Sequence, residues 1–134
     1  ERLARISAYH TPYHTALAEA LGTYDDPMVI SVHSFTDKPD LGDLRRVDIG
    51  LLVKHDEASA EALRQRFEDA DLDFVLGINE PYSAHVLNYT IDTAVAAHNM
   101  RHLAIEVKQS HIDTDDKALR MAKILAGRLE PLIR

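Results

Sequence analysis

Short apolar runs alternate along the chain with segments whose apolar residues recur at helical spacing, and this alternation constrains the fold more than any other feature. There are four runs: Met28–Val32, Val47–Val53, Phe74–Leu76 and Leu103–Val107. Short apolar runs bounded by polar or turn-forming residues are typical of buried strands. Strands that alternate with helices predict an α/β fold, with three layers and a mostly parallel mixed sheet of about four strands covered by helices. No helix separates the first two strands, so that pair could be antiparallel.

Each of the predicted helices presents one apolar face. The residues expected to point inward are Leu3, Ile6, Leu17 and Leu21 in the first helix, Ala58, Ala62 and Phe67 in the second, Leu87, Ile91, Ala94 and Val95 in the third, and Leu119, Ala122, Ala126 and Leu129 in the fourth. Asp56 and Ser83 are the predicted N-caps of the second and third helices, and the third ends near Asn99. Thr11-Pro12 interrupts the first helix, so this segment is either kinked or two helices end to end.

Charge and composition exclude several functions. Fifteen Lys and Arg against 22 Asp and Glu in 134 residues give a formal net charge of −7, which repels a nucleic-acid backbone. No apolar run approaches the roughly 20 residues that cross a bilayer, and the first residues do not resemble a signal peptide. We therefore expect one cytoplasmic domain over residues 1–134 that acts on a small molecule, without a membrane or nucleic-acid partner. The sequence does not predict the oligomeric state.

Cysteine is absent, which excludes disulfides, thiolate metal sites and cysteine nucleophiles. A metal site in this chain must therefore use His, Asp or Glu, and the sequence contains eight histidines.

Polar side chains follow or interrupt the predicted strands at positions where α/β proteins bind ligands. His33 follows the first strand, Asn79–Tyr82 follow the third, and Glu106 lies within the fourth. These groups are expected to gather at one sheet edge, beyond the carboxyl ends of the strands. Glu106 is the most informative of them, because an unpaired carboxylate inside an apolar strand is costly. Its partner is expected to be Lys108, Arg45 or a metal ion.

Structural explanations compete with these functional ones. His33 could be a hydrogen-bonded residue at a strand end, Glu106 could belong to a structural ion pair, and Asn79–Tyr82 could be only a turn. His10 and His14 have the i, i+4 spacing of two ligands on one helix, but the proline between them disturbs that geometry and favours a structural role. The remaining histidines are expected to be solvated: His55, His85, His98, His102 and His111.

Taken together, several segments resemble motifs of the N-formylglutamate amidohydrolase family, in the family's order. They are Arg5 with Tyr9, Pro12–His14, His33–Thr36, Gly42–Leu52 with Arg45, Asn79–Ser83 and Ile105–Gln109. The resemblance covers essentially the whole chain. It departs from the family at Asp37 and Lys108, where Pro and Arg are usual. The resemblance implies a zinc-exopeptidase-like or phosphorylase/hydrolase-like fold related to the metallocarboxypeptidases.

The resemblance also implies a zinc-dependent hydrolase of amino-acid metabolism, acting on a C–N bond other than a peptide bond. Its substrate class would be an N-acyl acidic amino acid such as N-formylglutamate. By similarity, His33 would be a zinc ligand and Glu106 the general base for the metal-bound water. Arg45 would bind a substrate carboxylate or the developing oxyanion. The substrate-binding residues would be Asn79, Glu80, Tyr82, Ser34 and Arg46.

Members of this family carry two further zinc ligands upstream of the helix that begins this chain, and a catalytic zinc ion takes three protein ligands. We therefore expect the chain to be the C-terminal part of a longer amidohydrolase domain. The alternatives are a non-catalytic domain that binds a small ligand or a partner without a complete metal site, and a structural domain that packs against a separate segment. The hydrolase hypothesis requires His33 and Glu106 to share one face of the sheet.

Overall fold

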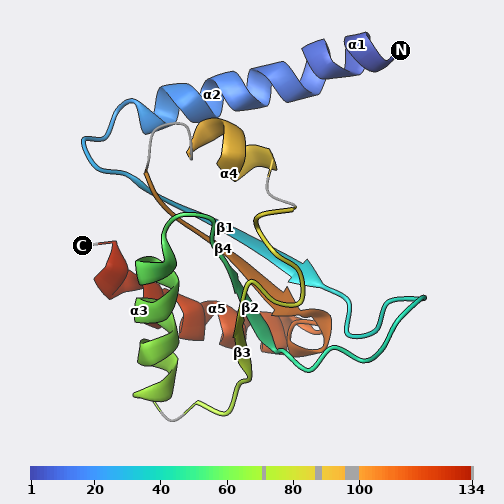
Figure 1. The fold of residues 1–134 in the computed structure, drawn as a ribbon, viewed down its shortest axis with the longest axis vertical. Helices are drawn as coiled ribbons and strands as arrows, with labels where there is room; N and C mark the ends of the chain where they lie inside the picture. Colours follow the sequence, from blue (N-terminus) through green and yellow to red (C-terminus); the bar gives the residue numbers. More distant parts are fainter. Residues whose placement is uncertain (71, 87–88, 96–99, 134) are drawn as a thin grey trace.

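The computed structural model describes residues 1–70, 72–86, 89–95 and 100–133, and its elements alternate as the sequence predicts (Figure 1). In chain order they are α1 (Arg2–Arg5), a π-helical segment (Ile6–His10), α2 (Thr11–Leu21), β1 (Met28–Phe35), β2 (Ile49–Leu52), α3 (Glu57–Glu68), β3 (Leu76–Ile78), α4 (Tyr89–Ala94), β4 (Arg101–Lys108), a 3-10 turn (Gln109–His111), α5 (Asp115–Leu129) and a final 3-10 turn (Glu130–Leu132). Among the described residues, no helix has both the length and the apolar character needed to cross a membrane.

The strands form one mixed sheet in the order β1-β4-β2-β3. β1 is parallel to β4, and β2 is parallel to β3, whereas β2 and β4 are antiparallel. The predicted α/β fold with a mostly parallel mixed sheet is therefore confirmed. β1 and β2 run in opposite directions, as the missing helix between them suggested, but they are not neighbours because β4 lies between them.

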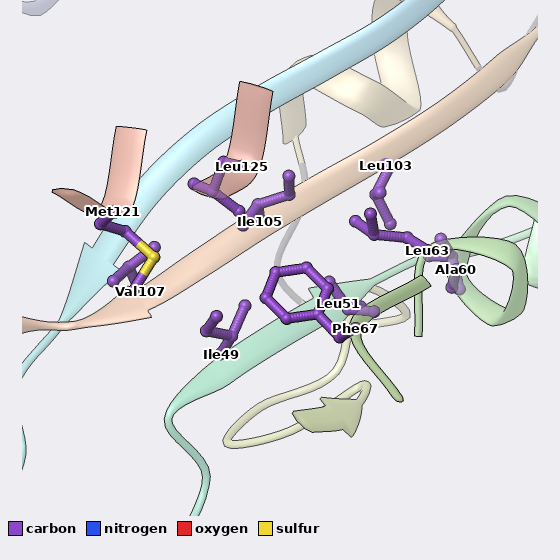
Figure 2. Close-up of a cluster of buried hydrophobic side chains, with 11 residues drawn as sticks. Ile49, Leu51, Ala60, Leu63, Phe67, Leu103, Ile105, Val107, Met121 and Leu125 are labelled. Carbon is purple, nitrogen blue, oxygen red and sulfur yellow. The ribbon is translucent and has the colours of Figure 1, made fainter. Parts of the chain in front are cut away.

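One face of the sheet carries the main hydrophobic core. Successive side chains of a strand point to opposite faces, so alternate residues of β2 and β4 face the same side. Figure 2 shows these side chains packed against α3 and α5. The buried residues of this cluster are Ile49, Leu51, Val53, Ala60, Leu63, Phe67, Leu103, Ile105, Val107, Met121 and Leu125.

The opposite face of the sheet carries a smaller apolar cluster and most of the polar strand residues. Leu52 and Ala104 pack there with Ala84, and the ring of Tyr82 covers them. Helices α2 and α4 contact each other, and Figure 1 shows them at one end of the molecule, away from α3 and α5. The sheet thus lies between two helical layers, as predicted.

The cap of α3 is predicted better than the helix faces. The Asp56 carboxylate accepts a hydrogen bond from the Ser59 amide at 3.1 Å and so caps α3 as predicted. Phe67 is buried as predicted, but the rest of the inward face is rotated, because Ala60 and Leu63 are buried while Ala58 is exposed. In α5 the buried residues are Met121 and Leu125, whereas the predicted Leu119 is 55% exposed and Ala122 and Ala126 are exposed too.

The predicted third helix is described only in part. Ile91 and Val95 are buried, as predicted, while Leu87, Asn99 and the side chain of Ala94 lie outside the described residues. Ser83 accepts a hydrogen bond from the His85 amide at 3.2 Å within a turn that precedes α4, so the prediction that it caps this helix is wrong.

The N-terminal helix continues through Thr11-Pro12 by changing its hydrogen-bond pattern. Pro12 has no amide hydrogen and its ring crowds the preceding turn, and residues Ile6–His10 form a wider π-helical turn just before it. No residue described between Arg2 and Leu21 is fully buried. The expectation that Leu3 points inward is therefore wrong, since its side chain is 78% exposed.

The third strand is displaced from its predicted position at Phe74–Leu76 to Leu76–Ile78. Asp48 explains the difference, because its side chain accepts the Val75 amide hydrogen at 2.9 Å. The Asp48 amide in turn donates to the Val75 carbonyl at 2.7 Å. This attachment holds the segment before β3 without a regular strand ladder.

Candidate functional site

His33 and Glu106 occupy paired positions on the adjacent parallel strands β1 and β4. Paired residues of neighbouring strands lie on the same face, so the two side chains are neighbours, as the hydrolase hypothesis requires. They line a cavity of about 600 Å3 together with Ser31 and Tyr82, and with residues of α2 and α4. Glu106 is only 7% exposed, whereas His33 is exposed.

One oxygen of the Glu106 carboxylate is unpaired within the described part of the chain. Its Oε2 atom is buried and has no hydrogen-bond partner among the described residues. The hydroxyl of Tyr82 donates a hydrogen bond to the carboxylate. Tyr82 is thus the partner of Glu106, in place of the Lys108 or Arg45 expected from the sequence, and Lys108 pairs with Asp48 at 3.1 Å.

Tyr82 is held in its protonated form. Burial raises the pKa of its phenol, and the hydrogen bond to Glu106 and the negative charge of Glu106 raise it further, to about 12. The positive charge of Arg45 acts in the opposite direction but is the smallest of these effects. Near neutral pH, Tyr82 therefore keeps its proton and can donate it in a hydrogen bond to Glu106.

Arg45 places a positive charge behind Tyr82. Its guanidinium carbon lies 5.4 Å from the centre of the Phe35 ring and 5.5 Å from the centre of the Tyr82 ring, which is cation–π distance. One guanidinium nitrogen donates to the Thr36 carbonyl at 3.1 Å. Arg45 is thus oriented by two rings and one carbonyl; it contacts Tyr82, which lines the cavity, but is not itself among the described lining residues.

The expectation that three strand ends meet at one edge is wrong. β3 is parallel to β2 and therefore antiparallel to β4, so its carboxyl end lies at the edge opposite that of β1 and β4. After β3 the chain reverses its direction. Asn79 adopts a left-handed conformation with φ 54°, which asparagine tolerates better than most residues, and the following residues return over the sheet toward Glu106.

The amide side chain of Asn79 fixes this turn. Its oxygen accepts hydrogen bonds from the amides of Val53 at 3.2 Å and Ala84 at 3.1 Å. Its nitrogen donates to the Val53 carbonyl at 3.0 Å. Asn79 therefore holds Tyr82 in place through the backbone, and it is not among the residues that line the cavity.

Two glycines make room for the returning chain. Gly50 and Gly77 are paired on β2 and β3. A Cβ atom at Gly50 would overlap the Glu80 carbonyl oxygen, and one at Gly77 would lie 2.8 Å from the Glu80 Cβ. The backbone of Glu80 can cross the sheet only because both positions lack a side chain.

The other predicted substrate-binding residues lie apart from the cavity. Ser34 alternates with His33 along β1 and so points to the opposite face. The side chains of Glu80 and Arg46 are exposed, and neither lines the cavity. The structure therefore gathers His33, Tyr82 and Glu106 at the cavity, with Arg45 against Tyr82.

Ser31 is a cavity residue that the sequence analysis missed. It precedes His33 by two positions and so shares its face of β1. Its hydroxyl oxygen is buried and has no hydrogen-bond partner among the described residues. The strand alternation could have indicated it, had the strand been extended to Phe35.

Four of the other described histidines have structural surroundings, whereas His55 and His85 are exposed, as expected. The rings of His10 and His14 stack at 4.1 Å, and His14 Nδ1 bonds the His10 carbonyl at 2.9 Å, which fits the structural role favoured for them. His102 was expected to be solvated, but it is 1% exposed and both ring nitrogens are bonded, Nε2 accepting from the Lys54 amide. His111 bonds Asp48 at 2.8 Å. His98 lies outside the described residues.

The described residues do not form a zinc site by themselves. Among them, no three His, Asp or Glu side chains lie close enough together to hold a metal ion, and a catalytic zinc ion takes three protein ligands. The cavity contributes at most His33, with Glu106 beside it. Further ligands would have to come from outside the described residues.

Comparison with solved structures identifies the fold. A crystal structure of a gene product from Agrobacterium tumefaciens superposes with a TM-score of 0.86 at 23% identity, covering 99% of this chain and 55% of that chain. The N-formylglutamate amidohydrolase of Ralstonia eutropha superposes with a TM-score of 0.58 at 18% identity, covering 81% of this chain and 43% of that chain. The chain thus spans about half the length of these structures.

Comparison with curated proteins gives no match. Comparison with protein families matches residues 1–112 to N-formylglutamate amidohydrolase. This segment includes α2, all four strands and every residue of the cavity. The chain therefore belongs to the N-formylglutamate amidohydrolase family.

Proposed function

We propose that this chain carries part of the active site of a hydrolase that cleaves the amide bond of an N-acyl acidic amino acid such as N-formylglutamate. The observation that supports this most is the Glu106 carboxylate, which has one buried, unpartnered oxygen in a cavity shared with His33. A carboxylate in this state can accept a proton from water.

In the proposed reaction, Glu106 Oε2 takes a proton from a water molecule as the water oxygen attacks the amide carbonyl carbon. The carbon–nitrogen bond then breaks, and Glu106 returns the proton to the leaving amine. From N-formylglutamate this gives formate and glutamate. Tyr82 keeps the carboxylate oriented through its hydrogen bond. Arg45, beside Tyr82, binds the substrate carboxylate or the developing oxyanion.

Zinc is the cofactor that the family resemblance implies, and we propose it only for a protein that supplies ligands besides His33. When bound, it would polarise the carbonyl and lower the pKa of bound water. The chain's own contribution would remain the base, its tyrosine partner and the arginine.

Formate release from N-formylglutamate, measured with the purified chain with and without added zinc, tests this proposal. Release that is lost in Glu106→Gln and kept in the control Glu19→Gln, an exposed position on α2, supports it. A zinc titration by calorimetry reports whether the metal binds. Binding of N-formylglutamate with no release under either condition would favour the alternative of a non-catalytic binding domain.

A further inference from the structure

Arg45 lies near the end of the loop that joins β1 to β2. From Lys38 to Leu44, every residue of this loop except Pro39 is exposed. Arg45, in contrast, is only partly exposed. An exposed loop makes few packing contacts that could hold a side chain in place. The position of Arg45 therefore depends on contacts at the two ends of the loop.

Arg45 joins these two ends to each other. Its amide donates a hydrogen bond to the Asp37 carbonyl oxygen at 2.9 Å. One of its guanidinium nitrogens donates to the Thr36 carbonyl oxygen at 3.1 Å. The backbone and the side chain of Arg45 are thus both attached to residues 36 and 37, so a movement of these two residues also moves the guanidinium.

The Asp37 carboxylate attaches residues 36 and 37 to the end of β4. Its Oδ1 atom accepts a hydrogen bond from the Ser110 amide at 3.0 Å, and Ser110 lies in the 3-10 turn directly after β4. A hydrogen bond from the Ser110 hydroxyl lowers the pKa of Asp37, and the Ser110 amide and the charges of Lys108 and His111 help to outweigh the opposing effect of burial. Asp37 is therefore ionised near neutral pH, and hydrogen bonds to an ionised acceptor are the stronger kind.

These contacts form a closed ring that begins and ends on β4. Glu106 on β4 accepts a hydrogen bond from Tyr82, and the Tyr82 ring contacts the Arg45 guanidinium. Arg45 is bonded to Asp37, which is bonded in turn to Ser110. Ser110 follows Glu106 by four residues. The ring therefore fixes where the positive charge of Arg45 lies relative to the Glu106 carboxylate, and the Asp37 side chain closes it.

On the basis of the proposed function, in which Arg45 binds the substrate carboxylate or the developing oxyanion, we infer that Asp37 is a positioning residue for substrate binding. It holds the Arg45 guanidinium against Tyr82 through its bonds to Ser110. Asp37 is not among the described residues that line the cavity, so it acts through Arg45 alone. The directed hydrogen bonds of a guanidinium to an anion depend on its geometry, so a displaced Arg45 binds the anion less well.

The NMR signal of the Arg45 side chain tests the positioning without any substrate. The Arg45 guanidinium carbon lies over the Phe35 and Tyr82 rings at 5.4 and 5.5 Å, and ring currents displace the signals of groups above an aromatic face to higher field. In Asp37→Ala the Arg45 Nε–H signal is expected to move toward that of a solvated arginine. Asp37→Asn keeps an acceptor oxygen and should retain the displacement. Asp40→Ala, at an exposed position of the same loop, is the control and should leave the signal unchanged.

Binding of N-formylglutamate, measured by calorimetry, tests the consequence for the substrate. Asp37→Ala is expected to weaken binding at least about threefold, and Asp37→Asn to restore most of it, because a small misplacement of a binding group is costly. In an Arg45→Gln background, Asp37→Ala should have no further effect, since residues that act through one contact are not additive.

Circular dichroism checks that each variant is folded. If Asp37→Ala does not fold, Ser110→Ala takes its place, because it removes only the hydroxyl bond to Asp37. It should displace the Arg45 signal in the same direction by a smaller amount.

An Arg45 signal that keeps its position in the folded variant overturns the inference, and so does an equal displacement in Asp40→Ala. A displaced signal with unchanged binding of N-formylglutamate contradicts the role of Asp37 in substrate binding. Weaker binding that Asp37→Ala also causes in the Arg45→Gln background contradicts it too, because Asp37 would then act by another route. A displaced signal with no binding of N-formylglutamate to the unmodified chain upholds the positioning of Arg45 and contradicts the proposed function.

Discussion

Gly50 on β2 lies directly opposite Glu106 on β4, and the missing side chain of the glycine leaves the space through which the Glu80 backbone passes. A Cβ atom at Gly50 would lie 3.3 Å from the Glu106 Cβ and would overlap the Glu80 carbonyl oxygen. The conformation of this candidate site therefore depends on a residue that contributes no functional group. The first prediction follows from this relationship.

Gly50→Ala is expected to push the Glu80 backbone off the sheet and so separate Tyr82 from Glu106. Overpacking of this kind lowers the free energy of unfolding by about 1–3 kcal/mol, measurable by urea denaturation. The matched control is Gly127→Ala in α5, where a Cβ atom would meet nothing within 4 Å. That change should raise the stability by about 0.5–1 kcal/mol, because alanine is the better helix former. Equal effects of the two changes would contradict the steric explanation.

The titration of Tyr82 reports its contact with Glu106. The pKa of Tyr82 is raised from 10.0 to about 12 by burial, by the hydrogen bond and by the charge of Glu106. Because the folded-state pKa is the higher one, the stabilisation is fully present below pH 10 and is lost as the pH rises from about 10 to about 12. Absorbance of tyrosinate should show one phenol titrating above the others. In Glu106→Gln this pKa should fall but stay above 10.0, because the burial remains.

The ionised carboxylate of Asp48 is expected to stabilise the fold at pH values above about 3.8. Burial opposes ionisation of its carboxyl, but hydrogen bonds from His111, the Val75 amide and Lys108 outweigh the burial and lower its pKa below 3.8. A lowered folded-state pKa gives stabilisation that is present above about pH 3.8 and is lost as the pH falls through the folded value. Asp48→Asn should therefore destabilise the chain by about 1–3 kcal/mol at pH 7. It should also flatten the dependence of stability on pH below pH 4, which denaturation at a series of pH values measures. Asp113→Asn, at an exposed pair with Lys117, should do neither.

Asn79→Ala removes three hydrogen bonds to the backbone and places alanine at φ 54°. We expect a loss of about 2–4 kcal/mol of unfolding free energy, from the unpaired amides and the left-handed conformation together. Asn79→Gly keeps the conformation accessible and loses only the bonds, so it should be less destabilising. If the two variants have the same free energy of unfolding, the left-handed conformation at position 79 does not contribute to the loss of stability in Asn79→Ala.

Local features of the sequence predicted the local structure. The positions of β1 and β4, the cap at Asp56 and the interruption at Pro12 all follow from a few neighbouring residues. The helix faces were less certain, because an alanine and a leucine both fit an apolar stripe until the partner surface is known. Two leucines show how the partner surface decides burial. Leu63 is packed in the core, whereas Leu119 of α5 is exposed.

The arrangement of the site could not be predicted in the same way. His33 and Glu106 were predicted as neighbours from their positions on strands, and the pairing of β1 with β4 brings them together. The pairing of Glu106 with Tyr82 depends on the order of the strands and on two glycines that admit the returning chain. These are contacts between distant segments, and no short motif in the sequence encodes them.

Ser31 offers a test in which stability and binding change in opposite directions. Its hydroxyl oxygen is buried without a partner among the described residues, so Ser31→Ala removes an unsatisfied polar group. The free energy of unfolding should stay the same or rise by up to about 1 kcal/mol, while the affinity for an N-acyl amino acid should fall about tenfold if the hydroxyl bonds the ligand amide. Ser34→Ala is the matched control, since that side chain points to the opposite face of β1. Urea denaturation and calorimetry on the same two variants measure both quantities, and a loss of stability in Ser31→Ala would show that the hydroxyl serves the fold and not the ligand.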